Sequence, residues 1–332
     1  MAEEQRLTRR YSERLGVLSG EQLQAALDRF DLGALVDAAP MPGGLFGQNV
    51  LVASTRGEWV LRGCPHFDWQ LPKERLAARL IHERTSLAAP WPYLLEPSPG
   101  IFGWSFAWMP RLPGRVAPSN PGGAEGRGVA AALGAGLARL HELRGEAAGD
   151  YDPAADAIVP SPASQRERVV ARLRQWLGWC REARAGCVGD GDVTWIEGVV
   201  ARRGAALDEP FEPCWVHHDW KDNNVLCEEA AGAWRVTGVV DLMEGYFGDG
   251  EEDLVRCIAL FALGDKGRIR GFTGAYRATW PLRPGFEDRY RIYQLVDSLV
   301  MWQYGQKNGL WFPPDLSFRA FAEPRVEGLR PF

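Results

Sequence analysis

The chain has 332 residues, of which 46% are hydrophobic, so it can bury a sizeable core and is long enough for two domains. Its net charge of −5 at pH 7 gives no electrostatic reason to expect nucleic acid as a partner. No run approaches the roughly 20 apolar residues of a membrane span, and the charged start from Met1 to Tyr11 lacks the apolar region of a secretory signal. The six cysteines show no zinc-binding spacing and suit buried thiols. We therefore expect a cytoplasmic protein without a membrane partner.

The first third of the sequence predicts a helix and then a sheet. Residues 1–33 carry apolar side chains at helical spacing, with Ser19 as a plausible N-cap. Apolar and β-branched runs predict strands at 50–53, 58–62, 93–95 and 104–109, within a five-stranded sheet. Between them, residues 71–83 form an amphipathic helix with Pro72 near its start.

The remainder of the chain predicts mainly helices. The prolines of the segment 110–113 stiffen a linker. We therefore predict a first domain over 1–111 and a second domain over 112–332. Helices are expected at 128–144, 166–184, 192–207, 253–260 and 287–303, with a loop over 145–163 and a tail from 307 that wraps the second domain.

A polar loop follows the short apolar run at 214–216 and carries the chemistry. It reads His217-x-Asp219-x-x-x-x-Asn224, and Asp241 follows a second apolar run, which is the spacing of a kinase catalytic loop and its metal-binding Asp. Phosphoryl transfer needs an acid to accept the hydroxyl proton, here Asp219, and ligands for Mg²⁺, here Asn224 and Asp241. A single Asp in a loop is most often a turn former. The whole set at fixed offsets indicates a kinase site instead.

With these residues the chain resembles the aminoglycoside phosphotransferase and choline-kinase-like small-molecule kinases, relatives of the protein kinases. The stretch 241–254 is similar to the second motif of that family, with Gly250 where Pro is usual. The resemblance spans about 43 to 302. It implies an α+β, two-lobed, protein-kinase-like fold whose small lobe is an antiparallel five-stranded sheet plus a helix and whose larger C-terminal lobe is mostly helical. It also implies ATP or GTP with Mg²⁺, and a small hydroxyl compound as acceptor, such as an antibiotic or an amino alcohol.

The resemblance further implies a nucleotide-binding set in the first domain. Arg62 falls where a protein kinase places its phosphate-binding Lys, and a guanidinium can also grip phosphate oxygens. Its acidic partner is Glu74, with Glu83 as the alternative. By itself, a glycine-rich turn between strands is weak evidence. In this context the resemblance implies that the glycines of this turn, and the strand before the linker at 110–113, also belong to the nucleotide-binding set. That linker corresponds to the hinge between the family's two lobes. The residues are Gly43, Gly44, Gly47, Trp108 and Met109.

Two further residues of the loop have predicted roles. His217 matches the family's His, which braces the loop by hydrogen bonding. Lys221 stands where serine/threonine protein kinases contact the transferred phosphate, so we assign it transition-state charge. The alternative for Lys221 is a lysine that faces solvent.

Acids beside the site offer candidates for the acceptor. Glu244, Glu251 and Glu252 could attract a cationic acceptor, or could form a solvated face. Asp297 and Trp302 on the late helix are weaker pocket candidates.

Other classes of protein remain as alternatives. A non-catalytic nucleotide-binding scaffold, or pseudokinase, would keep the fold, although the three chemical residues argue against it. A protein kinase is disfavoured because only eleven residues separate Asp241 from Asp253, too few for an activation loop, and Ala-Pro-Glu is absent downstream.

Overall fold

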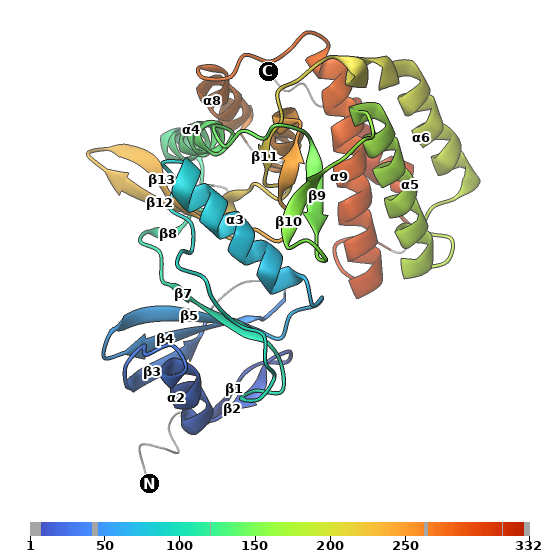
Figure 1. Cartoon of the computed structure of the whole chain (residues 1–332). Coiled ribbons are helices and arrows are strands. Elements are labelled where there is room, and N and C mark those ends of the chain that lie inside the picture. The colour runs from blue at the N-terminus through green and yellow to red at the C-terminus, as the bar shows by residue number, and fades with distance from the viewer. Residues whose placement is uncertain (1–7, 42–45, 120, 262–264, 314, 329–332) are drawn as a thin grey trace. The chain divides into compact units, whose positions relative to one another are not determined.

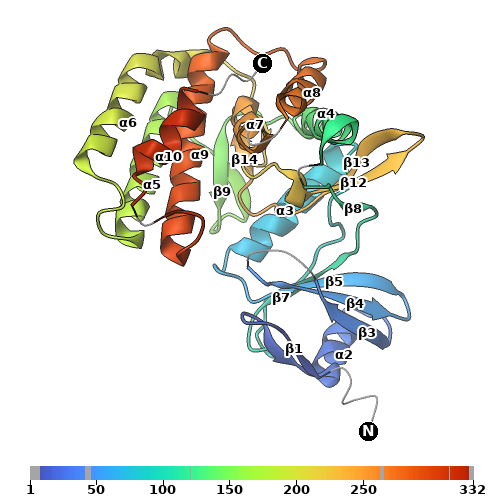
Figure 2. The same ribbon diagram turned by 180° about the vertical axis from the view of Figure 1, so that it is seen from behind.

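The computed structural model describes residues 8–41, 46–119, 121–261, 265–313 and 315–328. By packing, the chain divides into two compact units. Unit 1 comprises Met1–Arg115, Tyr151–Ala157 and Thr237–Met243, and unit 2 comprises Val116–Asp150, Ile158–Val236 and Glu244–Phe332. Figures 1 and 2 show the ribbon from opposite sides. A single cut after residue 111 cannot describe this division, because two later segments pack within unit 1.

Unit 1 is built on a five-stranded antiparallel sheet with the order β3-β4-β5-β7-β6. The strands are β3 (Leu35–Pro40), β4 (Asn49–Ser54), β5 (Gly57–Gly63), β6 (Leu94–Glu96) and β7 (Phe106–Pro110). Leu23 and Leu27 of α2 (Gly20–Asp28) share one buried cluster with Val52, Leu61 and Trp108 of the sheet. This arrangement follows from the period of two in the strands, which places alternate side chains on one face. Helix α3 (Gln70–Arg84) follows β5.

The prediction of a helix over 1–33 is wrong for residues 9–18, which form a hairpin of β1 (Arg9–Ser12) and β2 (Gly16–Leu18). Gly16, at φ +71°, has the left-handed backbone that a hairpin turn uses and a helix does not. The helix begins only after Ser19, whose side chain accepts the backbone N–H of Gln22 in a capping box. Strand β3 was not predicted, because its alternation of buried and exposed residues is irregular.

Unit 2 is mostly helical. Its helices are α4 (Gly123–Leu140), α5 (Gln165–Ala183), α6 (Asp190–Arg203), α7 (Leu254–Phe261), α8 (Lys266–Arg277), α9 (Phe286–Asn308) and α10 (Phe318–Val326). Short 3-10 helices lie at η1 (Gly204–Asp208), η2 (Asp222–Asn224) and η3 (Gly250–Asp253). Helix α4 packs on α8, and α5 lies beside α9 in both views (Figures 1 and 2).

Short strands connect these helices. One sheet has the order β10-β9-β14-β11, with β9 (Gly149–Asp152), β10 (Ala157–Pro160), β11 (Cys214–Val216) and β14 (Tyr246–Gly248). A second sheet has the order β13-β12-β8, with β8 (Arg115–Val116), β12 (Val225–Ala230) and β13 (Ala233–Val239). The predicted loop over 145–163 is therefore wrong, since it contains β9 and β10. Their Pro- and Asp-rich composition hides strands that form only by pairing within this sheet. Helix α8 was also not predicted.

Among the described residues, we find no helix that combines the length and the apolar character needed to cross a membrane.

Candidate active site

The loop after β11 is held by a buried carboxylate of η3. Asp253 accepts the backbone N–H of His217 and that of His218, each at 2.6 Å. His218 has φ +68°, which costs a residue with a side chain on the order of 1–3 kcal/mol. Such a conformation persists only where its surroundings impose it, and the two short hydrogen bonds to one buried carboxylate do so. The chain is therefore turned sharply just before Asp219.

The Asp219 carboxylate is held by three donors. Lys221 Nζ lies 2.6 Å and Asn224 Nδ2 lies 2.8 Å from Oδ2, while Arg256 Nη1 lies 2.8 Å from Oδ1. Burial by itself would raise the pKa of Asp219, but the charges of Arg256 and Lys221 outweigh it and hold the pKa below its ordinary value. Asp219 is therefore ionised at neutral pH and fixed in orientation, as a group that accepts a hydroxyl proton must be.

Arg256 of α7 is a candidate site residue that the sequence analysis missed. Its Nε lies 2.5 Å from Oδ1 of Asp297 on α9, so one guanidinium bridges Asp219 and Asp297. Arg256 stands three residues after Asp253 on the same turn of chain, and that helical spacing was the available signal. Asp297 was predicted to lie in an acceptor pocket. It is instead buried and paired with Arg256, so its contact is with the guanidinium that orients Asp219.

The two histidines of the loop differ in their surroundings. His217 is fully buried, and its Nδ1 accepts the backbone N–H of Asp219 at 3.3 Å. This contact fits the bracing role predicted for His217. Burial, assisted by the charges of Arg172 and Arg256, lowers the pKa of His218 to about 3, so this ring is neutral at physiological pH.

Lys221 is only partly accessible to solvent. Its side chain is 21% exposed, as is that of Asp219, with which it forms its ion pair. The ion pair with Asp219 therefore favours a role in the site over the alternative of a solvated lysine. Its predicted contact with the transferred phosphate stays a prediction.

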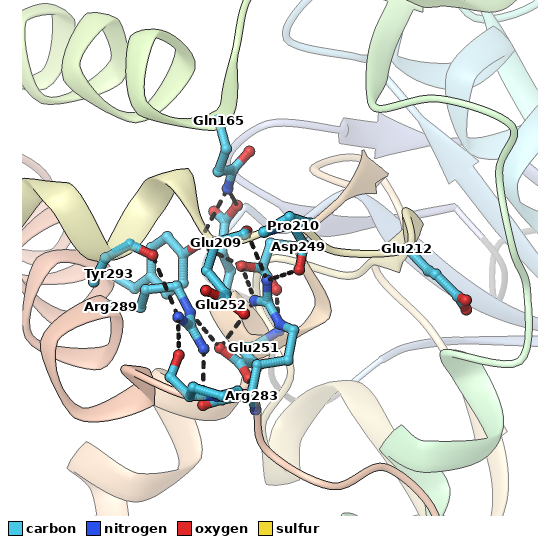
Figure 3. Close-up of polar contacts among 12 residues, drawn as sticks. Gln165, Glu209, Pro210, Glu212, Asp249, Glu251, Glu252, Arg283, Arg289 and Tyr293 are labelled. Carbon is cyan, nitrogen blue, oxygen red and sulfur yellow. Dashed lines mark hydrogen bonds and ion pairs between the residues drawn. The ribbon is translucent and has the colours of Figure 1, made fainter.

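The acids of η3 form a buried ionic cluster, shown in Figure 3. Glu251 accepts from Arg289 Nε at 2.7 Å and from Arg283 Nη2 at 3.0 Å. Glu252 accepts from Gln165 Nε2 at 2.8 Å. Both glutamates are buried, at 5% and 7% exposure. Neither is a solvated face and neither is open to a cationic acceptor, so this prediction is corrected: the acids neutralise arginines that tie η3 to α9 and to the chain before it.

The other two acceptor candidates lie apart from this cluster. Trp302 is fully buried, and its Nε1 donates to the carbonyl of Cys187 at 3.0 Å, so it is a core residue and not part of a pocket. The Trp302 side chain lies on the buried face of α9, whereas its neighbours Met301 and Gln303 are only half-buried. Glu244 is exposed in the turn before β14.

Gly250 explains a departure from the usual motif. A Cβ atom at this position would lie 2.6 Å from Sγ of Cys214 and 2.7 Å from Nδ1 of His141. His141 is itself held by Tyr276, at 2.9 Å, and by Asp253, at 3.2 Å. No residue with a side chain fits here unless these neighbours move.

Unit 1 carries a second set of polar residues around Arg62. Nε and Nη2 of Arg62 lie 2.6 Å from the two oxygens of Glu74, a bidentate ion pair. Glu74 is thus the partner of Arg62, and the alternative Glu83 is exposed on α3. Nη2 of Arg62 also lies 3.6 Å from Oδ1 of Asp241. Burial would lower the pKa of Arg62, but the two carboxylates outweigh it and raise that pKa, so the guanidinium stays charged.

Neighbouring side chains orient this pair. Tyr93 donates its hydroxyl to Glu74 at 2.8 Å, and Gln70 donates to the same carboxylate at 3.0 Å. Arg62 Nη1 donates to Oδ1 of Asn49 at 3.3 Å. Asp241 has φ +61°, a strained backbone of the kind found at functional sites. Its side chain is 37% exposed, so part of the carboxylate is accessible.

The remaining predicted nucleotide residues are placed as follows. Gly47 has φ +56°, and a Cβ there would lie 3.0 Å from that of Ser12, so the position favours glycine. Trp108 points into the core and donates Nε1 to the carbonyl of Ala26 at 2.9 Å. Only its backbone is therefore available beside the linker at 110–113. Met109 is buried on β7, at 8% exposure. The predicted positions Gly43 and Gly44 lie outside the described residues.

Solved structures share this fold. Aminoglycoside phosphotransferase APH(4)-Ia, solved as a thermostable mutant with AMP-PNP and hygromycin B, matches with a TM-score of 0.63 and 17% identity over 92% of this chain and 96% of its own. Macrolide 2'-phosphotransferase MphH from Brachybacterium faecium matches with a TM-score of 0.57 and 18% identity, over 93% of this chain and 99% of its own. Plasmodium vivax ethanolamine kinase Pv091845 matches with a TM-score of 0.53 and 12% identity, over 85% of this chain and 79% of its own. These likenesses establish the class: an α+β protein with the two-lobed, protein-kinase-like fold.

The family follows from the sequence. The pattern of the phosphotransferase enzyme family matches residues 37–286, more than half of the chain. The chain belongs to this family. No curated protein matches it in sequence.

Proposed function

We propose that this protein moves the γ-phosphate of ATP or GTP to a hydroxyl of a small molecule. The observation that supports this most directly is the Asp219 carboxylate, which Lys221, Arg256 and Asn224 hold ionised and oriented. A fixed anion of this kind orients a hydroxyl for in-line attack and accepts its proton. The reaction leaves a phosphorylated acceptor and a nucleoside diphosphate.

Asn224 and Asp241 are the proposed Mg²⁺ ligands. Asn224 turns its amide nitrogen toward Asp219, at 2.8 Å from Oδ2, so its amide oxygen is the atom that remains for a metal. Amide and carboxylate oxygens are the donors that Mg²⁺ prefers, so the residues fit this ion. When bound, Mg²⁺ supplies charge that neutralises the phosphates.

Arg62 and Lys221 are the proposed phosphate-binding cations. The two carboxylate oxygens of Glu74 contact Nε and Nη2 of Arg62 and so fix the orientation of the guanidinium. The guanidinium keeps its positive charge, as arginine does in proteins. Lys221 lies beside the base and would add positive charge where the transferred group forms. The backbone of the segment around Gly47 and Met109 would complete nucleotide binding. The six unpaired cysteines support the cytoplasmic location proposed for this activity.

The neighbouring structures bind or are named for small hydroxyl compounds: hygromycin B, a macrolide and ethanolamine. They support a small-molecule acceptor for this chain too.

Replacement of Asp219 by Asn tests the proposal. The substitution keeps the shape and removes the charge, so we expect acceptor-dependent ADP release, followed across a panel of antibiotics, amino alcohols and sugars, to fall by at least 100-fold. The control is Asp222→Asn, the same chemical change in the same loop at a partly exposed carboxylate. A nucleotide-binding scaffold would bind ATP identically in the unaltered protein and in both variants, and none of the three would release ADP. That result would refute the enzymatic proposal.

A further inference from the structure

The hairpin of β1 and β2 precedes the part of the chain that the family shares. The family's pattern begins at residue 37, whereas the hairpin covers 9–18. A two-stranded hairpin is only marginally stable in water, so it needs packing against other elements. Tyr11, Leu15 and Leu18 supply that packing, because they are buried in the same cluster as the sheet of unit 1. The hairpin is therefore an integral part of unit 1 that the family's pattern does not include.

Ser12 at the end of β1 anchors the segment before β4. Its hydroxyl donates to the carbonyl of Gly47 at 2.5 Å and accepts the backbone N–H of Leu15 at 2.9 Å. The second contact orients the hydroxyl, so its proton is directed at Gly47. A Cβ atom at Gly47 would lie 3.0 Å from that of Ser12, so glycine permits this close approach. The hairpin thereby holds the backbone that the function proposed above assigns to nucleotide binding.

Arg14, in the turn of the hairpin, anchors the segment after β5. Its Nε donates to the carbonyl of Cys64 at 2.6 Å, and its Nη2 donates to that of Pro65 at 2.8 Å. Cys64 has φ +50°, a left-handed backbone that a residue with a side chain keeps only where its surroundings impose it. The rigid fork of the guanidinium, with donors on two successive carbonyls, is such a constraint. The N–H of Gly63 donates to the carbonyl of Gln48 at 2.9 Å, so both anchored segments lie at the same end of β4 and β5.

Two buried amides link the anchored turn to Arg62. Nε2 of Gln48 donates to the carbonyl of Cys64 at 2.9 Å, and its Oε1 accepts from Nε2 of Gln70 at 3.2 Å. Gln70 also donates to Glu74 at 3.0 Å, and Glu74 holds the guanidinium of Arg62. Because both glutamines are buried, loss of a partner would leave a polar group unsatisfied. A continuous chain of hydrogen bonds therefore runs from the hairpin to the proposed phosphate-binding cation.

We propose that the hairpin is a positioning element for the phosphates of the nucleotide, and that Ser12 and Arg14 are its positioning residues. This rests on the nucleotide binding proposed above and adds what orients the groups that bind. Ser12 orients the backbone at Gly47. Arg14 orients the turn at Cys64 and, through the two amides, the guanidinium of Arg62. Backbone N–H groups and a guanidinium bind phosphate more tightly when they are already oriented, because less conformational freedom is lost on binding.

Calorimetric titration of the full chain with ATP in the presence of Mg²⁺, and with adenosine, tests the proposal. We expect the affinity for ATP to fall about fivefold in Ser12→Ala, which loses one hydrogen bond, and about tenfold in Arg14→Gln, which loses the bidentate fork. The affinity for adenosine should stay unchanged, because adenosine carries no phosphates. If the unaltered protein binds GTP more tightly than ATP, GTP and guanosine take their places.

Matched controls stand at the opposite end of β4. Ser54 donates its hydroxyl to the carbonyl of Leu32 at 2.6 Å, and Arg56 donates Nη1 to the carbonyl of Asp31 at 2.5 Å. Five residues of strand, about 17 Å, separate Ser54 from Asn49 at the anchored end. Ser54→Ala and Arg56→Gln remove the same kinds of hydrogen bond as the hairpin variants, and they should leave the affinity for ATP unchanged.

A double variant tests whether Arg14 acts through the pair of Glu74 and Arg62. In the Glu74→Gln protein, Arg14→Gln should lower the affinity for ATP by less than threefold, because the link to Arg62 is already weakened. A full tenfold loss in that background would show that the two residues act independently, and would overturn the proposed positioning of Arg62.

An affinity for ATP within twofold of that of the unaltered protein in both hairpin variants would overturn the proposal. An equal loss of affinity for ATP and for adenosine would also overturn it, since general disruption weakens both. Ser12→Ala removes a single oxygen atom and still provides the test if Arg14→Gln does not fold. Failure of the proposed function is visible in other measurements: the unaltered protein would bind neither nucleotide, or its ATP hydrolysis would persist in Asp219→Asn.

Discussion

Replacement of Arg256 by Gln tests how the base is held. The guanidinium donates to Asp219 at 2.8 Å and to Asp297 at 2.5 Å, and its side chain is only 11% exposed. Opposite charges about 4 Å apart attract by roughly 4 kcal/mol at an effective dielectric constant of about 20. Lys221 and Asn224 still hold the other oxygen of Asp219 in the variant. We therefore expect about half of this attraction energy to be lost. A loss of roughly 2 kcal/mol lowers kcat/KM about 30-fold.

The pH profile distinguishes this role from a general loss of structure. Arg256 lowers the pKa of Asp219, so its removal raises that pKa. The ionised base is then lost at a higher pH, and the acid limb of kcat/KM moves upward. The free energy of unfolding of the variant should also depend less on pH in acid. A carboxyl with a lowered folded pKa stabilises the fold above its unfolded pKa and loses that contribution as the pH falls through the folded value, so the variant loses less stability in acid.

The assay is kcat/KM from pH 4 to 9, with Arg127→Gln as the control. Arg127 belongs to the same unit and pairs with Asp265, but about half of its side chain is exposed. Asp297→Asn should act in the same direction as Arg256→Gln, and the two effects should be markedly less than additive because they share one bridge. A profile that superimposes on that of the unaltered enzyme, with kcat/KM within threefold, would refute the reasoning.

Three further predictions follow from the structure. Lys221→Met should lower kcat by at least 100-fold with little change in ATP affinity, measured by steady-state kinetics and nucleotide titration; an unchanged kcat would exclude a transition-state role. Glu74→Gln should raise the KM for ATP about tenfold through loss of a bidentate partner, whereas Glu83→Gln, on the exposed face of the same helix, should leave it unchanged. Gly250→Ala should lower the free energy of unfolding by about 2 kcal/mol in denaturant titrations, because its methyl group would lie 2.6 Å from a buried sulfur. Gly274→Ala, with open space around it in α8, should be neutral or slightly stabilising, and equal effects at the two sites would contradict the clash.

Sequence patterns located the local elements that are strongly periodic. Strands β4 and β5, helix α3 and the cap at Ser19 follow from side-chain alternation and capping chemistry, which act over a few residues. The patterns failed where local preference is weak. The hairpin of β1 and β2 is a local pairing of weak strand formers, which the helical spacing of the following residues masked. Strand β9 joins its sheet by pairing with the distant β14, so the residues of β9 and β10 do not by themselves reveal that sheet.

By itself, the sequence indicated the proposed chemistry: Asp219, Asn224 and Asp241 stand at the offsets of a phosphoryl-transfer site, and these offsets can be read without a structure. Only the tertiary structure decided which charges pair. Arg256 reaches Asp219 from α7, Glu251 is buried against Arg289, and Trp302 belongs to the core. The physical reason is that a spacing along the chain fixes neighbours within one loop, whereas the partner of a buried charge is set by packing between elements far apart in sequence.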